Sequence, residues 1–258
     1  MDLARVQELF DTEMRRDAAT DRPGNTLERT GGVVRQTGGA DDWNGILWSG
    51  LTADTADAAI AAQIRHYSDR GLPFEWKLYS HDEPHDLGQR LLAAGFEPEE
   101  PEALMVAETA ALPAGPPLPD GVRLLPVTDR AGVELLVRAH EAAFGEDGAH
   151  LGARVLAQLT EAPERISAVV AMAGDEPVSG ARAEFPPGAR FAGLWGGGTT
   201  AAWRGKGIYR ALVAHRAHQA AERGYRYLQV DAMDTSRPIL ERLGFVRLTT
   251  TTPYNYQP

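Results

Sequence analysis

The chain contains no cysteine among its 258 residues. This absence excludes disulfide scaffolds, cysteine-ligated zinc, iron–sulfur clusters and a thiol nucleophile. Basic side chains are also in deficit, with 26 Lys and Arg against 36 Asp and Glu and a formal net charge of −10. Binding a nucleic-acid phosphate backbone requires clustered basic side chains, so we expect no nucleic acid among the partners.

Long apolar runs are absent as well. No stretch of about 18 apolar residues occurs, and residues 1–17 mix acidic and basic side chains without the apolar segment of a signal peptide. We therefore expect a cytoplasmic protein, with no membrane partner, that exists as a monomer or a homodimer.

A segment rich in proline and glycine interrupts the chain. Residues 112–121 hold four prolines and two glycines in ten positions, which continue neither a helix nor a central strand. The chain length favours one to two domains. We interpret the segment as a linker between a first domain, 1–111, and a second domain, 122–258.

The second half mixes predicted strands and helices. Because some strands adjoin directly and others alternate with helices, the fold class is α+β with a mixed, α/β-like sheet. The periodicity predicts strands over 122–127, 166–173, 178–185, 191–199, 225–230 and from 245 onward, and helices over 129–144, 149–159, 208–223 and 236–243.

The first half repeats the second in a degenerate form. Segments 45–50, 74–79 and 91–96 correspond in order to segments 193–197, 225–230 and 240–245. The interval from Trp48 to Gly71 is 23 positions, whereas that from Trp195 to Gly224 is 29. The missing six residues fall in the interval that holds a glycine-rich turn in the second half. We interpret this as a duplication in which the first copy kept the fold and lost ligand binding.

The glycine-rich turn is the clearest candidate binding site. It lies between a predicted strand and a helix start, where free backbone N–H groups and the helix dipole attract an anion. Three glycines, Gly196 to Gly198, end the preceding strand and indicate a bulge or a ligand lying against the backbone. An ordinary basic turn that caps a helix is the alternative. The turn consists of Arg204, Gly205, Lys206, Gly207, Ile208 and Tyr209.

Neither a Walker loop nor a dinucleotide-binding glycine motif is present. The turn instead resembles the acyl-CoA loop of the GNAT superfamily of N-acetyltransferases, Arg/Gln-x-x-Gly-x-Gly/Ala. Arg204 and Gly207 match this pattern, while Tyr209 replaces the final small residue. The family's closing Leu-Gly-Phe is matched by residues 243–245, and Leu240 stands where the family usually has a tyrosine acid.

The resemblance covers residues 122–250 well and 1–110 in outline. It implies a tandem GNAT protein with a degenerate first copy, in which each domain is a mixed, mostly antiparallel sheet flanked by helices. It further implies acetyl-CoA as co-substrate and no metal. Gly197 and Thr199 would bind pantetheine, and a backbone N–H near Gly198 would stabilise the oxyanion. Ser236 would approach CoA or, alternatively, cap the following helix.

Acetyl transfer to an amine needs a neutral nitrogen, and an amine of pKa about 10 is neutral only about once in a thousand molecules at pH 7. A base is therefore useful. Glu184 is the first candidate and Asp231 the second, although either carboxylate also fits a solvated or structural role. Tyr254, near the C-terminus, is a candidate proton donor or lid residue.

We therefore expect an enzyme that moves an acetyl group from acetyl-CoA to the amine of a small molecule or peptide, by direct attack in a ternary complex. The net charge of −10 favours a cationic acceptor. Two alternatives remain: a silent acyl-CoA-binding sensor, and an enzyme that uses a longer acyl-CoA or a carrier-protein thioester. The histidines at positions 81 and 85 lie in a polar turn without a third ligand, so we expect no metal there.

Overall fold

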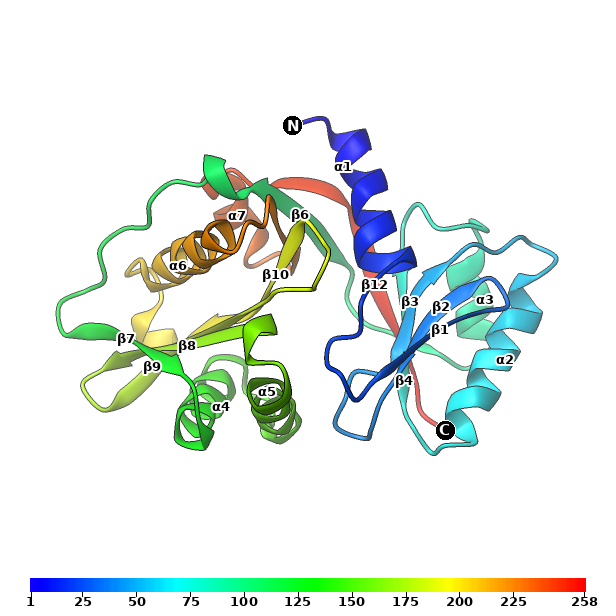
Figure 1. The fold of residues 1–258 in the computed structure, drawn as a ribbon, viewed down its shortest axis with the longest axis horizontal. Helices are drawn as coiled ribbons and strands as arrows, with labels where there is room; N and C mark the ends of the chain where they lie inside the picture. The colour runs from blue at the N-terminus through cyan, green and yellow to red at the C-terminus, as the bar shows by residue number, and fades with distance from the viewer. The chain divides into compact units, whose positions relative to one another are not determined.

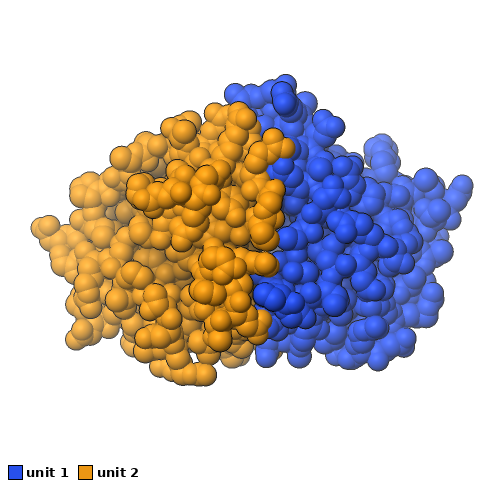
Figure 2. Space-filling view, in the orientation of Figure 1, with its two compact units in different colours: residues 1–105, 231–237, 247–258 blue, residues 106–230, 238–246 orange.

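The computed structural model describes residues 1–258 as two compact units. The first unit comprises Met1–Met105, Asp231–Arg237 and Arg247–Pro258, and the second comprises Val106–Val230 and Pro238–Val246 (Figure 2). Seven α-helices and twelve strands make up the fold. This confirms the predicted mixed α+β class.

The first unit is built around strands ordered β1-β2-β3-β4-β12, in which β3 and β4 are parallel and the other neighbours antiparallel. Strand β6 (Glu102–Glu108) starts in this unit and ends in the second. The elements are α1 (Leu3–Phe10), η1 (Asp11–Arg16), β1 (Thr26–Thr30), β2 (Val33–Thr37), β3 (Gly45–Ser49), α2 (Ala56–Ser68), β4 (Phe74–Tyr79), α3 (Leu87–Ala93), β5 (Glu97–Pro98) and β12 (Val246–Tyr256).

The final strand completes the sheet of the first unit. Residues Thr251–Tyr256 of β12 pair antiparallel with Phe74–Tyr79 of β4. The predicted second domain, 122–258, instead includes this strand. Its location has a physical cause, because without β12 the strand β4 would expose a row of unpaired backbone groups. Tyr254 and Tyr256 also pack on the aromatic core of the first unit.

The second unit has strands ordered β11-β10-β9-β8-β7, antiparallel except for the parallel pair β10 and β11. Strand β9 begins two residues before the predicted start, because the turn after β8 closes tightly at Gly174 (φ +60°). The elements are η2 (Thr109–Ala111), β7 (Val122–Val127), α4 (Arg130–Phe144), α5 (Ala149–Glu161), η3 (Pro163–Arg165), β8 (Ile166–Ala173), β9 (Glu176–Glu184), β10 (Phe191–Thr199), η4 (Ala201–Trp203), α6 (Ile208–Glu222), β11 (Tyr227–Ala232) and α7 (Arg237–Leu243).

Helices cover both faces of this second sheet (Figure 1). On one face, Val133, Leu136 and Val155 of α4 and α5 pack against β7 and β8. On the other face, Ile208 and Leu212 of α6 pack against β8 and β9. The sheet is therefore buried between two helical layers, and α6 starts where β10 ends.

The proline-rich segment 112–121 lies along α6. A Cβ on Gly115 would come within 2.7 Å of Ala214 Cβ, and Pro116 Cγ lies 3.4 Å from where a Cβ of Gly207 would stand. The whole segment belongs to the second unit. The segment interpreted as a linker thus also packs against the helix start that holds the glycine-rich turn.

Candidate functional site

Strands β10 and β11 separate soon after they begin to pair. The parallel ladder joins Phe191–Gly193 to Tyr227–Gln229 and then ends, although β10 continues to Thr199. On its other edge, β10 shifts register against β9 between Trp195 and Gly198, around a left-handed Gly196 (φ +59°). The later part of β10 therefore forms no ladder with β11, which leaves that edge open to an extended ligand.

The glycines of this strand fit narrow spaces between helices. A Cβ on Gly198 would lie 2.4 Å from Phe144 Cε2 on α4, and a Cβ on Gly197 would lie 3.0 Å from Tyr209 Cε2 on α6. Real Cβ contacts are essentially never as short as the first. The two glycines let α4 and α6 approach the bulge from opposite faces.

The turn between η4 and α6 presents backbone N–H groups at the helix start. Gly205 and Gly207 adopt left-handed conformations (φ +76° and +89°), and the N-cap Gly207 has no side chain to cap the helix. The bond from Ala211 N to Gly207 O is the first intrahelical hydrogen bond of α6. The backbone N–H groups of residues 208–210 therefore have no acceptor within the helix. Such an uncapped N-terminus with its dipole is suited to binding a phosphate group.

The two cations of the turn have different partners. Arg204 is engaged by the protein, since its Nε donates to Thr199 O (3.0 Å) and its Nη2 to Ala143 O (3.0 Å). It therefore fastens the turn to the ends of β10 and α4. Lys206 Nζ lies 4.3 Å from the centre of the Trp203 ring. A cation–π contact of this kind keeps the ammonium group beside the turn.

A serine on β9 supports the end of β10 by hydrogen bonds. Ser179 on β9 donates its hydroxyl to Gly198 O (2.6 Å) and lies 2.9 Å from Thr199 Oγ1. The two contacts of Ser179 hold Gly198 and Thr199 in place beside the helix start. The Tyr209 ring on α6 lies against Gly197, and burial raises the pKa of its phenol.

Glu184, at the end of β9, is ion-paired. Its Oε1 lies 3.4 Å from Arg182 Nε and 3.5 Å from Arg154 Nη2. Burial alone would raise the pKa of this carboxyl, but the two guanidinium groups outweigh burial and keep the pKa below its ordinary value. Glu184 is therefore ionised at neutral pH.

The other predicted side chains belong to the first unit. Asp231 forms an ion pair with Lys77 on β4, and its Oδ1 is buried without a hydrogen-bond partner. Ser236 donates its hydroxyl to Met233 O (3.2 Å), which stabilises the turn before α7. The Tyr254 hydroxyl lies 2.6 Å from the position of a Cβ on Gly88. Glu184 belongs to the second unit, as do the predicted residues of β10 and the 204–209 turn, and it lies opposite Gly193 in the register of β9 and β10.

A titratable group beside Asp231 escaped the sequence analysis. Glu102 on β6 is half-buried, and burial together with the charge of Asp231 raises its pKa to about 7. Burial also raises the pKa of Glu75, which accepts a hydrogen bond from Trp43 Nε1 (2.7 Å). Nothing in the local sequence indicates this cluster, because its members come from β4, β6 and β11.

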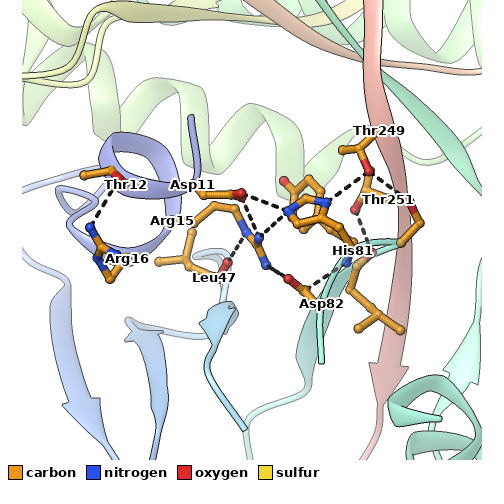
Figure 3. Close-up of polar contacts among 12 residues, drawn as sticks. Asp11, Thr12, Arg15, Arg16, Leu47, His81, Asp82, Thr249 and Thr251 are labelled. Carbon is orange, nitrogen blue, oxygen red and sulfur yellow. Dashed lines mark hydrogen bonds and ion pairs between the residues drawn. The ribbon is translucent and has the colours of Figure 1, made fainter. Parts of the chain in front are cut away.

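In the first unit, the parallel strands β3 and β4 also separate, as β10 and β11 do in the second unit, and an arginine side chain lies beside the separation. Strands β3 and β4 pair only at Gly45–Ile46 and Glu75–Trp76. Arg15 of η1 lies beside this separation, donates from Nε to Leu47 O (3.1 Å) and is only 2% exposed (Figure 3). The loss of ligand binding in the first copy stays a prediction.

Arg15 is held by further polar contacts (Figure 3). Its Nη2 donates to both oxygens of Asp82 at 2.8 and 2.7 Å, and its Nη1 donates to Asp11 Oδ1 at 2.7 Å. His81 joins Asp11 Oδ2 (2.9 Å) to Thr249 Oγ1 (3.1 Å). The polar turn that begins at His81 thus contributes to a side-chain network that holds η1 against the sheet.

Comparison with known proteins gives a consistent result. Residues 133–245 match the Acetyltransferase (GNAT) family. No curated protein sequence matches the chain.

No group of three or more metal-ligating side chains is placed to hold a metal ion, and no helix has the length and apolar character needed to span a bilayer.

Several solved structures share the fold over most of the chain. A GCN5-related N-acetyltransferase from Kribbella flavida matches with a TM-score of 0.72 and 18% identity, covering 100% of this chain and 96% of the other. A GCN5-related N-acetyltransferase from Sphaerobacter thermophilus matches with a TM-score of 0.57 and 15% identity, covering 88% and 78%. A tandem GNAT protein from the clavulanic acid biosynthesis pathway matches with a TM-score of 0.59 and 14% identity, covering 92% and 84%.

Proposed function

We propose that the protein transfers an acetyl group from acetyl-CoA to a primary amine, and the match of residues 133–245 to the Acetyltransferase (GNAT) family supports this proposal. One observation carries the proposal: the uncapped N-terminus of α6 directly follows the edge of β10 that leaves the β11 ladder. Residues 200–207 thus connect the open strand edge to the proposed phosphate site.

The pyrophosphate of acetyl-CoA fits the turn at 204–209. The N–H groups at 208–210 and the ammonium group of Lys206 supply donors and positive charge, and a Cβ at Gly205 would meet only open space. Charge-assisted hydrogen bonds contribute roughly 1.5–3 kcal/mol each, so three or four account for much of a micromolar affinity. Arg204 acts as a positioning residue, since its Nε and Nη2 both donate to backbone carbonyls.

The pantetheine arm would lie along the open edge of β10, beside Gly197 and Thr199. In the transfer, the amine nitrogen attacks the thioester carbonyl carbon and forms a C–N bond. The negative charge that develops on the carbonyl oxygen is assigned to a backbone N–H near Gly198. The C–S bond then breaks, the CoA sulfur leaves with its electron pair, and the proton that the attacking nitrogen loses balances the one that the thiolate takes up.

Glu184 is the candidate catalytic carboxylate within the second unit. It is ionised at neutral pH and ends β9, one strand away from the proposed pantetheine edge. Its low pKa weakens it as a proton acceptor, so its charge serves best by orienting the amine or a water. Asp231 and Tyr254 as catalytic residues, and Ser236 as a CoA contact, stay predictions.

We propose that one acetyl-CoA binds per chain. In the first unit, Arg15 already donates to β3 and contacts the Tyr79 ring on β4 at 4.0 Å. A second pantetheine arm would have to displace a buried guanidinium from Asp82. The first copy therefore contributes structure and no second donor site.

The test is CoA release from acetyl-CoA in the presence of a panel of amines. Release that depends on the amine supports the enzyme. Binding of acetyl-CoA without release on any amine supports the silent sensor instead. Parallel assays with propionyl-, malonyl- and succinyl-CoA and with an acyl carrier protein thioester show whether the donor is a different acyl group.

A further inference from the structure

Two arginines and one carboxylate occupy the face of the second sheet that α4 and α5 cover. Arg182 on β9 is 9% exposed, and Arg154 on α5 has 22% of its side chain exposed. Both are held only loosely by the single Glu184 Oε1, at 3.4 and 3.5 Å. These distances exceed the 2.7–2.9 Å of a good charge-assisted hydrogen bond.

The arginines keep unused donors. Arg154 Nε is buried and has no acceptor, and the buried Gln158 Oε1 nearby on α5 has no donor. Arg182 donates from Nε to Glu184 Oε1 at the long distance of 3.4 Å. Guanidinium groups that are this well buried normally complete their hydrogen bonds. The set is therefore incomplete without another acceptor.

The local charge is also unbalanced. Arg216 of α6 adds a third buried guanidinium, which donates to Arg182 O (3.1 Å) and Leu212 O (3.1 Å) and has no carboxylate partner. Burial and the neighbouring Arg154 lower the pKa of Arg182 to about 10, and burial lowers that of Arg216 to about 10. Three cations thus share one carboxylate, in a protein whose overall charge is −10.

The unbalanced cations lie beside the proposed thioester edge. Arg182 Nη1 is 3.2 Å from the position of a Cβ on Gly196, and Arg216 Nη2 is 3.4 Å from that of a Cβ on Gly197. The guanidinium groups of Arg182 and Arg216 are therefore next to the bulge of β10, where acetyl transfer is proposed to occur.

We propose that Arg154 and Arg182 bind a carboxylate of the substrate, so that the natural acceptor is an amine that also carries a carboxylate, of the amino-acid type. The inference rests on the proposed acetyl transfer and names its substrate class. It replaces the expectation of a cationic acceptor, which rested on the net negative charge of the whole chain. The side chains beside the β10 bulge are positively charged, so they attract an anionic group. A carboxylate is the favoured anion, since two guanidinium forks match its planar oxygen pair.

The same carboxylate has a second possible source. A dicarboxylic acyl group, as in malonyl- or succinyl-CoA, would also place a carboxylate next to the thioester. The chemistry that Arg154 and Arg182 recognise is identical in both cases. The donor arm of the experiment below distinguishes them.

The kinetic experiment compares amino acids with their decarboxylated amines: phenylalanine with phenethylamine, lysine with cadaverine and histidine with histamine, each with acetyl-CoA and with succinyl-CoA. We expect CoA release with at least one amino acid and release at least tenfold slower with its amine. Arg182→Gln should raise the amino-acid KM by about tenfold to a hundredfold. Arg138→Gln, an exposed arginine on α4, is the matched control and should leave KM unchanged.

The outcomes separate the two proposals. Amines that react as fast as amino acids, with a KM unchanged by Arg182→Gln, overturn the carboxylate site and leave acetyl transfer intact. Release from succinyl-CoA with plain amines, lost in Arg182→Gln, places the carboxylate on the acyl group and overturns the amino-acid acceptor. Absence of release with every pair and donor overturns the proposed function.

A binding measurement decides the carboxylate site without turnover. Propionate and its neutral isostere propionamide are titrated into the full-length protein, and the arginine Nε–H signals are followed by NMR. The signals of Arg154 and Arg182 should shift saturably with propionate only. Arg182→Gln should abolish the shift of Arg154, while Arg138→Gln should preserve it. Equal shifts with propionamide, or no saturable shift, contradict the site.

Discussion

The Arg15 guanidinium lies 2.7 Å from Asp82 Oδ2, beside the point where β3 and β4 separate (Figure 3). The two residues are 67 positions apart, and both side chains are almost fully buried. In the second unit the separation of β10 and β11 is the proposed path of pantetheine. The same structural feature thus has a protein partner in one copy and a proposed ligand in the other.

Replacement of Arg15 should destabilise the first unit strongly. Arg15→Met would leave Asp82 buried without its partner, and breaking a buried ion pair by removing one partner costs about 3–5 kcal/mol. Arg16→Met is the control, because that side chain is 51% exposed and should change stability by less than about 0.5 kcal/mol. Urea unfolding followed by circular dichroism gives both values. Similar values for the two variants would show that the Arg15 network contributes little.

Adding one methyl group at Gly198 should destabilise the second unit. The new Cβ of Gly198→Ala would lie 2.4 Å from Phe144 Cε2, and overpacking of this kind costs about 1–3 kcal/mol. Removal of the ring should relieve the shortest contacts and leave the 2.9 Å approach to Ala143 Cβ, so Gly198→Ala should cost less in a Phe144→Ala background. A double-mutant cycle measured by thermal unfolding checks this. Costs that simply add would mean that the contact with Phe144 is not the cause.

The ion pairs of Glu184 should make stability depend on acid pH. Its pKa is lowered in the folded protein, so the contribution is present above the unfolded pKa of about 4.3 and is lost as pH falls through the folded value. The stability advantage of wild type over Glu184→Gln should therefore shrink below about pH 4.3. Urea unfolding at pH 3 and pH 7 measures the difference. An advantage that is independent of pH would show that Glu184 is not stabilised by its arginines.

Glu102 should have the opposite effect. Its pKa of about 7 lies above the unfolded value of about 4.3, so folding favours the protonated form. Stability should fall as pH rises from about 4.3 to 7, and Glu102→Gln should remove this loss. Carbon-13 NMR of the labelled carboxyl group measures the pKa directly. A titration midpoint near 4.3 would refute the raised pKa.

Local patterns in the sequence predicted most of the fold. The bounds of β7, β8 and β10 agree with the predicted ranges, because alternating or continuous apolar residues end at glycine or polar turns there. The α6 helix agrees to within one residue. Its start is marked by Gly207 and its end by Gly224, which have left-handed conformations.

The partners of the site residues could not be predicted in the same way. Arg204 resembles a phosphate ligand in the sequence, yet it binds carbonyls at Thr199 and Ala143, the second of which is 61 positions away. The pairing of Glu184 with Arg154 and the pairing of β12 with β4 in the first unit also depend on contacts between residues far apart in the sequence. Spacing along the chain carries no signal for such contacts.

Calorimetric titration of acetyl-CoA into wild type and a matched pair of Gly205 variants decides whether acyl-CoA binds at the start of α6. Gly205 is left-handed and its Cβ position is open, so Gly205→Asn and Gly205→Asp are equally strained, and they differ mainly in charge. We expect one acetyl-CoA per chain for wild type, similar binding for Gly205→Asn, and binding at least tenfold weaker for Gly205→Asp because its carboxylate would repel the pyrophosphate. Equal affinity in the two variants, or no binding to wild type, would contradict an acyl-CoA site at the start of α6.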